Sequence, residues 1–205
     1  EFDNMFAGCQ IMQKLDLSSF DTSSAVSMSQ MFDNCMYLHD LNVSSFDTRN
    51  VTTIDSMFNN CIHMKNLDLS SFHTPNLENA RYLFLNCRNL ESLNLANFDT
   101  AKLNGDQTYY MFRSVSSLDR INVSPSFFNG DIICNCPYWQ ETKWAQENNP
   151  RNIKTWLNIS QSTDNSEAGW WKLVHDWSIL TFNSNGGTEI ADVKDRTGNS
   201  IDLTK

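Results

Sequence analysis

Apolar side chains along the first 124 residues recur with a constant period. The pair Met-Phe stands at Met5-Phe6, Met31-Phe32 and Met57-Phe58, becomes Leu83-Phe84, and returns at Met111-Phe112, at intervals of 26, 26, 26 and 28 residues. Three residues after the phenylalanine, the first four copies carry Cys9, Cys35, Cys61 and Cys87. A fixed period of this length is the signature of a repeat architecture, because one such unit cannot bury its apolar face without a neighbour. The pattern therefore predicts a row of stacked units.

Two kinds of periodicity occur within each unit. The alternation of Leu15 and Leu17 is typical of a strand with one buried face. Further along, Ile54, Phe58 and Cys61 follow at steps of three and four, which predicts one face of a helix, and Ser27 with Gln30 has the spacing of a capping box at its start. We therefore expect an α/β fold: a leucine-rich-repeat solenoid of 26-residue strand–helix units over residues 1–124.

Polar residues flank the inward leucines and are expected to point outward on the concave strand face. They are Lys14, Asp16, Asp40, Asn42, Asn66, Asp68, Asn94, Arg120 and Asn122. One interpretation is ordinary solvated surface. The other is a hydrogen-bonding platform for a glycan or an extended polypeptide, since repeat proteins often bind ligands on such a face.

The composition changes after Ser124, and all six tryptophans lie in this second part. A stack of repeats exposes an apolar cross-section at its end, so residues 125–178 are expected to form a Trp-rich C-terminal cap. Trp170 and Trp171 are an alternative binding site, because aromatic rings stack on sugar faces, although adjacent tryptophans in a cap are also core candidates. Residues 179–205, with a turn signal at Asn185-Gly186-Gly187, predict a short β segment.

Charge and the absence of motifs narrow the classes of function. The 24 acidic against 15 basic residues give a net charge of −9, which disfavours a nucleic-acid partner. No apolar run reaches the length of a membrane span. No metalloprotease, nucleophile-elbow or phosphate-loop pattern occurs, so we expect no catalytic residues, no metal and no cofactor.

Two columns of side chains could bind a metal ion, but each has a simpler structural explanation. The cysteine column lies within an apolar face and predicts buried thiols, since a linear row cannot converge on one tetrahedral metal. The row Asp21, Asp47, His73 and Asp99 follows the Ser-Ser-Phe-Asp-Thr segments. Its expected role is local, with Asp and Thr side chains bonding turn amides, although a cation site in this row is an alternative.

The string L-x-L-S-S-F-D-T followed by V-x-x-M-x-x-M-F-x-x-C-x-x-L resembles the BspA-like leucine-rich repeat over roughly residues 1–128. Residues 180–201 resemble the start of a Listeria–Bacteroides repeat of the internalin B type. The first resemblance implies a bacterial cell-surface adhesin with a host or extracellular-matrix protein or glycan as partner. It also implies an extracellular, anchored location, with the anchor and signal outside this chain, which we expect to be a piece of a longer protein.

The sequence thus predicts a non-enzymatic interaction module that binds through its concave strand face. Two alternatives belong to other classes. One is a structural spacer without a ligand of its own, and the other is a glycan-processing enzyme with its site in the cap.

Overall fold

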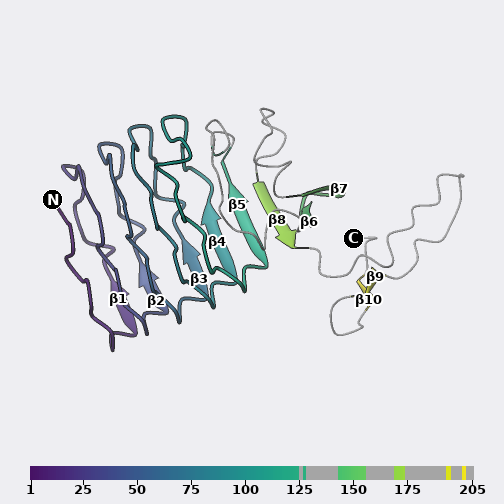
Figure 1. The fold of residues 1–205 in the computed structure, drawn as a ribbon, viewed down its shortest axis with the longest axis horizontal. Helices are drawn as coiled ribbons and strands as arrows, with labels where there is room; N and C mark the ends of the chain where they lie inside the picture. The colour runs from purple at the N-terminus through teal and green to yellow at the C-terminus, as the bar shows by residue number, and fades with distance from the viewer. Residues whose placement is uncertain (125–126, 128–142, 156–168, 174–192, 195–199, 202–205) are drawn as a thin grey trace, which may run out of the picture.

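The computed structural model describes residues 1–124, 127, 143–155, 169–173, 193–194 and 200–201 (Figure 1). Its strands are β1 (Lys14–Asp16), β2 (Asp40–Asn42), β3 (Asn66–Asp68), β4 (Ser92–Leu95), β5 (Arg120–Val123), β6 (Lys143–Gln146), β7 (Asn149–Thr155), β8 (Gly169–Leu173), β9 (Val193–Lys194) and β10 (Ser200–Ile201). Within these residues the chain forms no helix. The predicted solenoid of strand–helix leucine-rich-repeat units is therefore wrong, and the repeats consist of short strands joined by turns.

Consecutive turns replace each predicted helix. In the second repeat the N–H of Met31 bonds the carbonyl of Met28, and the N–H of Cys35 bonds that of Phe32. The third residue of each turn, Gln30 and then Asn34, has a φ of 58°. An α-helix requires negative φ throughout and bonds four residues apart, whereas a bond three residues apart with positive φ at the third position is typical of a type II turn. The sequence placed Gln30 in a capping box at the start of a helix, whereas in the structure it occupies the left-handed position of a turn.

Each repeat bonds to the next through its backbone. The N–H of each repeated phenylalanine donates to a carbonyl one repeat later: Phe6 to Met31 at 2.9 Å, Phe32 to Met57 at 3.0 Å, Phe58 to Leu83 at 3.0 Å and Phe84 to Met111 at 2.9 Å. These bonds satisfy peptide groups that would otherwise be buried without a partner. The period of the sequence is thus the period of the stack.

Buried side chains add two further series of bonds between repeats. The Thr74 hydroxyl donates to the carbonyl of Asp99 at 2.9 Å and accepts from its N–H at 2.8 Å, and Thr22 does the same with Asp47 one repeat apart. In the turns, the Asn60 amide donates to Asn34 at 3.0 Å and accepts from Asn86 at 2.9 Å. Polar side chains at these positions are therefore part of the stacking rather than of a ligand site.

The core lies between the strands and the turns of each repeat. Phenylalanine rings stack along it, with centroid separations of 5.7 Å from Phe6 to Phe32, 5.4 Å from Phe32 to Phe58, 5.9 Å from Phe58 to Phe84 and 5.3 Å from Phe84 to Phe112. Phe58 is fully buried. The apolar positions predicted from the sequence do face inward, although from turns and not from helices.

The strands form a broken row along one side of the stack (Figure 1). β1 pairs with β2, and a second sheet has the order β3-β4-β5-β8-β6-β7. Pairs between successive repeats are parallel, while β8 lies antiparallel to β5. The sheet therefore continues across Ser124 into the second part of the chain.

Most of the predicted cap and of the predicted terminal repeat lies outside the described residues. Of residues 179–205, the structure describes only β9 and β10, which form an antiparallel pair. The resemblance of this segment to a Listeria–Bacteroides repeat stays a prediction.

Candidate functional site

The strand residues predicted to face outward do so. Lys14, Asp16, Asp40, Asn42, Asn66 and Asp68 are exposed, and Asn94, Arg120 and Asn122 are partly exposed. The parallel register places Asp16 beside Asn42, Asp68 beside Asn94, and Asn94 beside Asn122. We call this surface the outer strand face. β2 and β3 are not paired, so the sheet beneath this face is interrupted between the second and third repeats.

Many polar atoms of the outer strand face bond locally. Oδ1 of Asp16 accepts the N–H of Ser18 at 3.0 Å, Oδ1 of Asn42 accepts that of Ser44 at 3.1 Å, and Asp68 and Asn94 repeat this bond two residues on. The bonds from Ser18 stabilise the carboxylate and lower the pKa of Asp16. The Asp16 carboxylate also bonds the side chain of Asn42. Asp16 and Asp68 are exposed carboxylates without an ion pair among the described residues, and they are therefore the principal anionic acceptors on the face.

Trp170 extends the same surface, whereas Trp171 does not. β8 pairs with β5 so that Trp170 lies opposite Asn122 and Trp171 lies opposite Ile121. Facing residues of an antiparallel pair share a side of the sheet, so Trp170 joins the outer strand face. Trp171 is fully buried and does not belong to this face, and its assignment as a binding residue stays a prediction. The two candidate sites of the sequence, strand face and Trp170, thus form one surface.

Arg120 orients the Trp170 side chain where β8 pairs with β5. Its guanidinium carbon lies 4.0 Å from the centroid of the Trp170 ring, and its Nε and Nη2 donate to Glu147 at 2.5 and 2.9 Å. A guanidinium over an indole is a favourable cation–π contact that also limits the rotation of both side chains. Amide, guanidinium and indole groups are therefore presented together.

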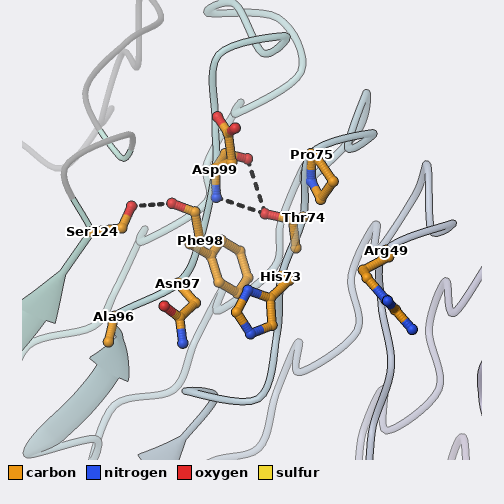
Figure 2. Close-up of a pocket in the computed structure, with 9 residues that line it drawn as sticks. All are labelled: Arg49, His73, Thr74, Pro75, Ala96, Asn97, Phe98, Asp99 and Ser124. Atoms are coloured by element: carbon orange, nitrogen blue, oxygen red, sulfur yellow. Dashed lines mark hydrogen bonds between the residues drawn. The ribbon is translucent and has the colours of Figure 1, made fainter.

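A hollow of about 380 Å³ lies on a different part of the stack, at the Ser-Ser-Phe-Asp-Thr turns (Figure 2). Its polar side chains are mostly engaged: Arg49 pairs with Asp47, and Asn97 donates to the carbonyl of Ser70 at 2.6 Å. Asp99 is its one carboxylate, and it accepts the N–H of Ala101 at 2.9 Å. The hollow therefore lacks the paired acids that a glycan-processing enzyme uses.

The aspartate row has the local role that the sequence predicts. Asp21, Asp47 and Asp99 each accept the backbone N–H two residues on. In Asp47 the bonds from Arg49, with the charges of Arg49 and His73, lower the pKa to about 2. Among the described residues no His, Cys, Asp and Glu side chains gather into a metal-binding group.

The cysteine column is buried over most of its length. Cys35, Cys61 and Cys87 are at most 1% exposed and donate to the carbonyls of Phe6, Phe32 and Phe58 one repeat earlier. Cys9 is exposed, so the prediction fails for the first member. Cys134 and Cys136 lie outside the described residues. Burial raises the pKa of Cys35 to about 11 and that of Cys87 to about 12, and it raises the pKa of Cys61 well above its ordinary value.

Maleimide labelling of the native protein at pH 8 is expected to modify Cys9 within minutes and to leave Cys35 and Cys61 unmodified. With its pKa near 11, roughly one Cys35 in a thousand is a thiolate at that pH, and burial also blocks access. Peptide mapping by mass spectrometry separates the sites. Rapid modification of Cys35 and Cys61 before denaturant is added would show that the column is accessible.

Sequence reasoning overlooked a third group of residues. Tyr82, Tyr109 and Tyr110 come together on the turns of the fourth and fifth repeats, with Arg113 4.2 Å from the Tyr110 centroid. The adjacent aromatic pair was a readable signal, because the matching turn positions of earlier repeats are mainly polar. The apolar period directed the prediction to the core instead.

The comparisons give a family but no close relative. No curated protein and no solved structure matches the chain. In the part of the chain that is described, no helix is long and apolar enough to cross a membrane. A family model matches residues 1–124, the segment that contains all the repeats. Since this match covers more than half of the chain, the protein belongs to the family described as Mycoplasma protein of unknown function, DUF285.

Proposed function

We propose that the chain is an extracellular interaction module of a bacterial cell-surface adhesin, and that it binds a host or matrix glycan or protein through the outer strand face. The observation that carries the proposal is the position of Trp170 beside Asn122, with Arg120 against its ring. The partly exposed indole offers apolar surface on the part of its ring that Arg120 leaves uncovered, and the neighbouring amides and carboxylates offer directional hydrogen bonds. Such a combination suits sugars and extended polypeptides.

The charge of the face favours some ligands over others. Among the described residues its carboxylates without an ion pair are those of Asp16 and Asp68, while Lys14 pairs with Asp40 at 3.1 Å and Arg120 pairs with Glu147. A third cation, Lys172, lies opposite Arg120 on the same face, is exposed and forms no ion pair among the described residues. The carboxylates of Asp16 and Asp68 outnumber this one unpaired cation. Hydroxyl-rich, amide-rich or basic ligands are favoured over anionic ones.

The cell-surface assignment draws on the resemblance of the repeats to BspA-like proteins. The family match supports a repeat domain common to a group of bacterial proteins, and it leaves the ligand open. A spacer without a ligand is the competing proposal, and it does not explain why Trp170 lies partly exposed on the polar face of the sheet. A glycan-processing enzyme has less support, because the one cap acid described, Glu147, is bound to Arg120.

Trp170→Ala is expected to weaken binding about fivefold, or roughly 1 kcal/mol, to any ligand found by a screen of glycans and matrix proteins. The indole is partly exposed, so its removal should leave the fold in place. Tyr37→Ala is the matched control, because Tyr37 is 47% exposed and stacks on His63 away from Trp170. Equal losses for both variants, or none for Trp170→Ala, would contradict the proposed site.

A further inference from the structure

The turns of the fourth and fifth repeats carry an aromatic cluster that the strand-face function does not use. Tyr109 stacks on Tyr110 with ring centroids 3.8 Å apart, and Tyr82 meets both rings at centroid distances of 5.9 and 6.1 Å. Tyr109 is 37% exposed. The turns lie across the core from the strands, so this cluster is separate from the outer strand face.

The backbone under the cluster is strained. Tyr82 and Tyr110 have φ values of 55° and 57°. In this left-handed region Gly and Asn are tolerated, whereas a bulky side chain is a genuine outlier. The second turn of each repeat obeys the rule in the first four repeats, with Gly8, Asn34, Asn60 and Asn86 at its left-handed position.

The turn position of Tyr82 and Tyr110 has positive φ in every repeat, including Gln30 at 58° and Ser56 at 55°, so the stack of repeats imposes this conformation. The first repeat has Asn4 at the position of Tyr82 with almost the same φ, 58°. The turn itself therefore has no need of a tyrosine. The aromatic side chains need another explanation, and presentation to a ligand supplies one.

Two arginines give the cluster a charge opposite to that of the whole chain. The Arg113 guanidinium lies over the Tyr110 ring, and Arg81 occupies in its repeat the place that Tyr109 occupies in the next. Among the described residues neither arginine forms an ion pair, although Arg81 Nε donates to the carbonyl of Asp106 at 2.6 Å and the charge of Arg81 partly offsets the rise in the pKa of Asp55 that burial causes. Both keep guanidinium N–H groups free, and these suit a carboxylate.

We propose that Tyr82, Tyr109, Tyr110, Arg81 and Arg113 form a second binding site, whose ligand is an acidic glycan. A pyranose ring stacks its C–H face on the exposed Tyr109, and a uronic-acid carboxylate accepts hydrogen bonds from the guanidinium groups. Hydrogen bonding with Tyr110 raises the pKa of Tyr109, which shows that the two hydroxyl groups also interact. The site differs from the outer strand face in selecting a negative ligand.

The test uses the whole chain and two matched probes: a tetrasaccharide of alternating glucuronic acid and N-acetylglucosamine, and the neutral tetrasaccharide of N-acetylglucosamine. Isothermal titration is expected to show binding of the acidic probe and at least tenfold weaker binding of the neutral one. Arg113→Gln should reduce that preference to about one. No binding of the acidic probe at millimolar concentration, or equal binding of both, would overturn the proposal.

A second variant separates the site from the fold. Tyr82→Asn should weaken binding of the acidic probe about tenfold while the midpoint of thermal unfolding stays the same or rises, because asparagine relieves the backbone strain. Gln30→Asn is the control at the same turn position, and it should leave binding unchanged. Trp170→Ala should also leave it unchanged, since that residue belongs to the outer strand face. The proposed site would be contradicted if Tyr82→Asn bound the acidic probe as well as wild type does. It would also be contradicted if Trp170→Ala weakened binding as much as Tyr82→Asn.

Discussion

Phe58→Ala is expected to lower the free energy of unfolding by roughly 3–5 kcal/mol, the usual cost of truncating a packed phenylalanine. Its ring is fully buried at the middle of the stack, between Phe32 and Phe84. The change removes apolar contacts and leaves a cavity. Neighbouring repeats cannot collapse into this cavity easily, because backbone bonds on both sides fix their separation.

Asn42→Ala is the matched control on the outer strand face. Asn42 is exposed and bonds the N–H of Ser44 and the Asp16 side chain, both at the surface, so its loss should change the free energy of unfolding by no more than about 0.5 kcal/mol. Urea denaturation of the wild-type protein, Phe58→Ala and Asn42→Ala gives the change in the free energy of unfolding for each variant. Similar losses in both variants would mean that the inward and outward faces have been exchanged.

The faces of the repeat were predictable, but the secondary structure of half of it was not. Apolar residues at steps of three and four point to one side of a helix, and in this fold they also point to one side of consecutive turns. Positive φ at Gln30, Ser56 and Tyr82 is what distinguishes the two, and none of these residue types indicates it. Asn34, Asn60 and Asn86 did carry such a signal, since asparagine favours left-handed turn positions.

The candidate site was predictable in its strand residues and not in its extension. Period 2 around Leu15, Leu41 and Leu67 was enough to place Asp16, Asn42 and Asp68 outside. The sequence did not show that Trp170 and Trp171 lie in a strand, so both were named as one alternative binding site. Once β8 is known, its two neighbouring side chains must point to opposite sides of the sheet. The antiparallel pairing of β8 with β5 joins segments almost fifty residues apart, and a local sequence pattern cannot predict such a contact.

Replacing both Asp16 and Asp68 by Lys is expected to reduce binding to a strand-face ligand by at least about tenfold, or roughly 1.4 kcal/mol. The change puts cations where the face has its unpaired carboxylates and reverses the local field, which governs attraction and selectivity. Both side chains are exposed, so the repeats should still fold. Each carboxylate also accepts a backbone N–H, and the double Asn variant therefore serves as a control that keeps this bond while removing the charge.

The most direct measurement is the affinity of the Asp16→Lys, Asp68→Lys double variant beside that of Glu91→Lys, for the best ligand from a glycan array and immobilised matrix proteins. Glu91 is exposed immediately before β4 and pairs with Lys65 at 3.0 Å, so Glu91→Lys makes one acid-to-lysine change, half the charge change of the double variant, away from the outward strand positions. The strand-face account predicts at least a tenfold loss in the double variant and affinity close to wild type for Glu91→Lys. Loss of binding in Glu91→Lys with none in the double variant would contradict it.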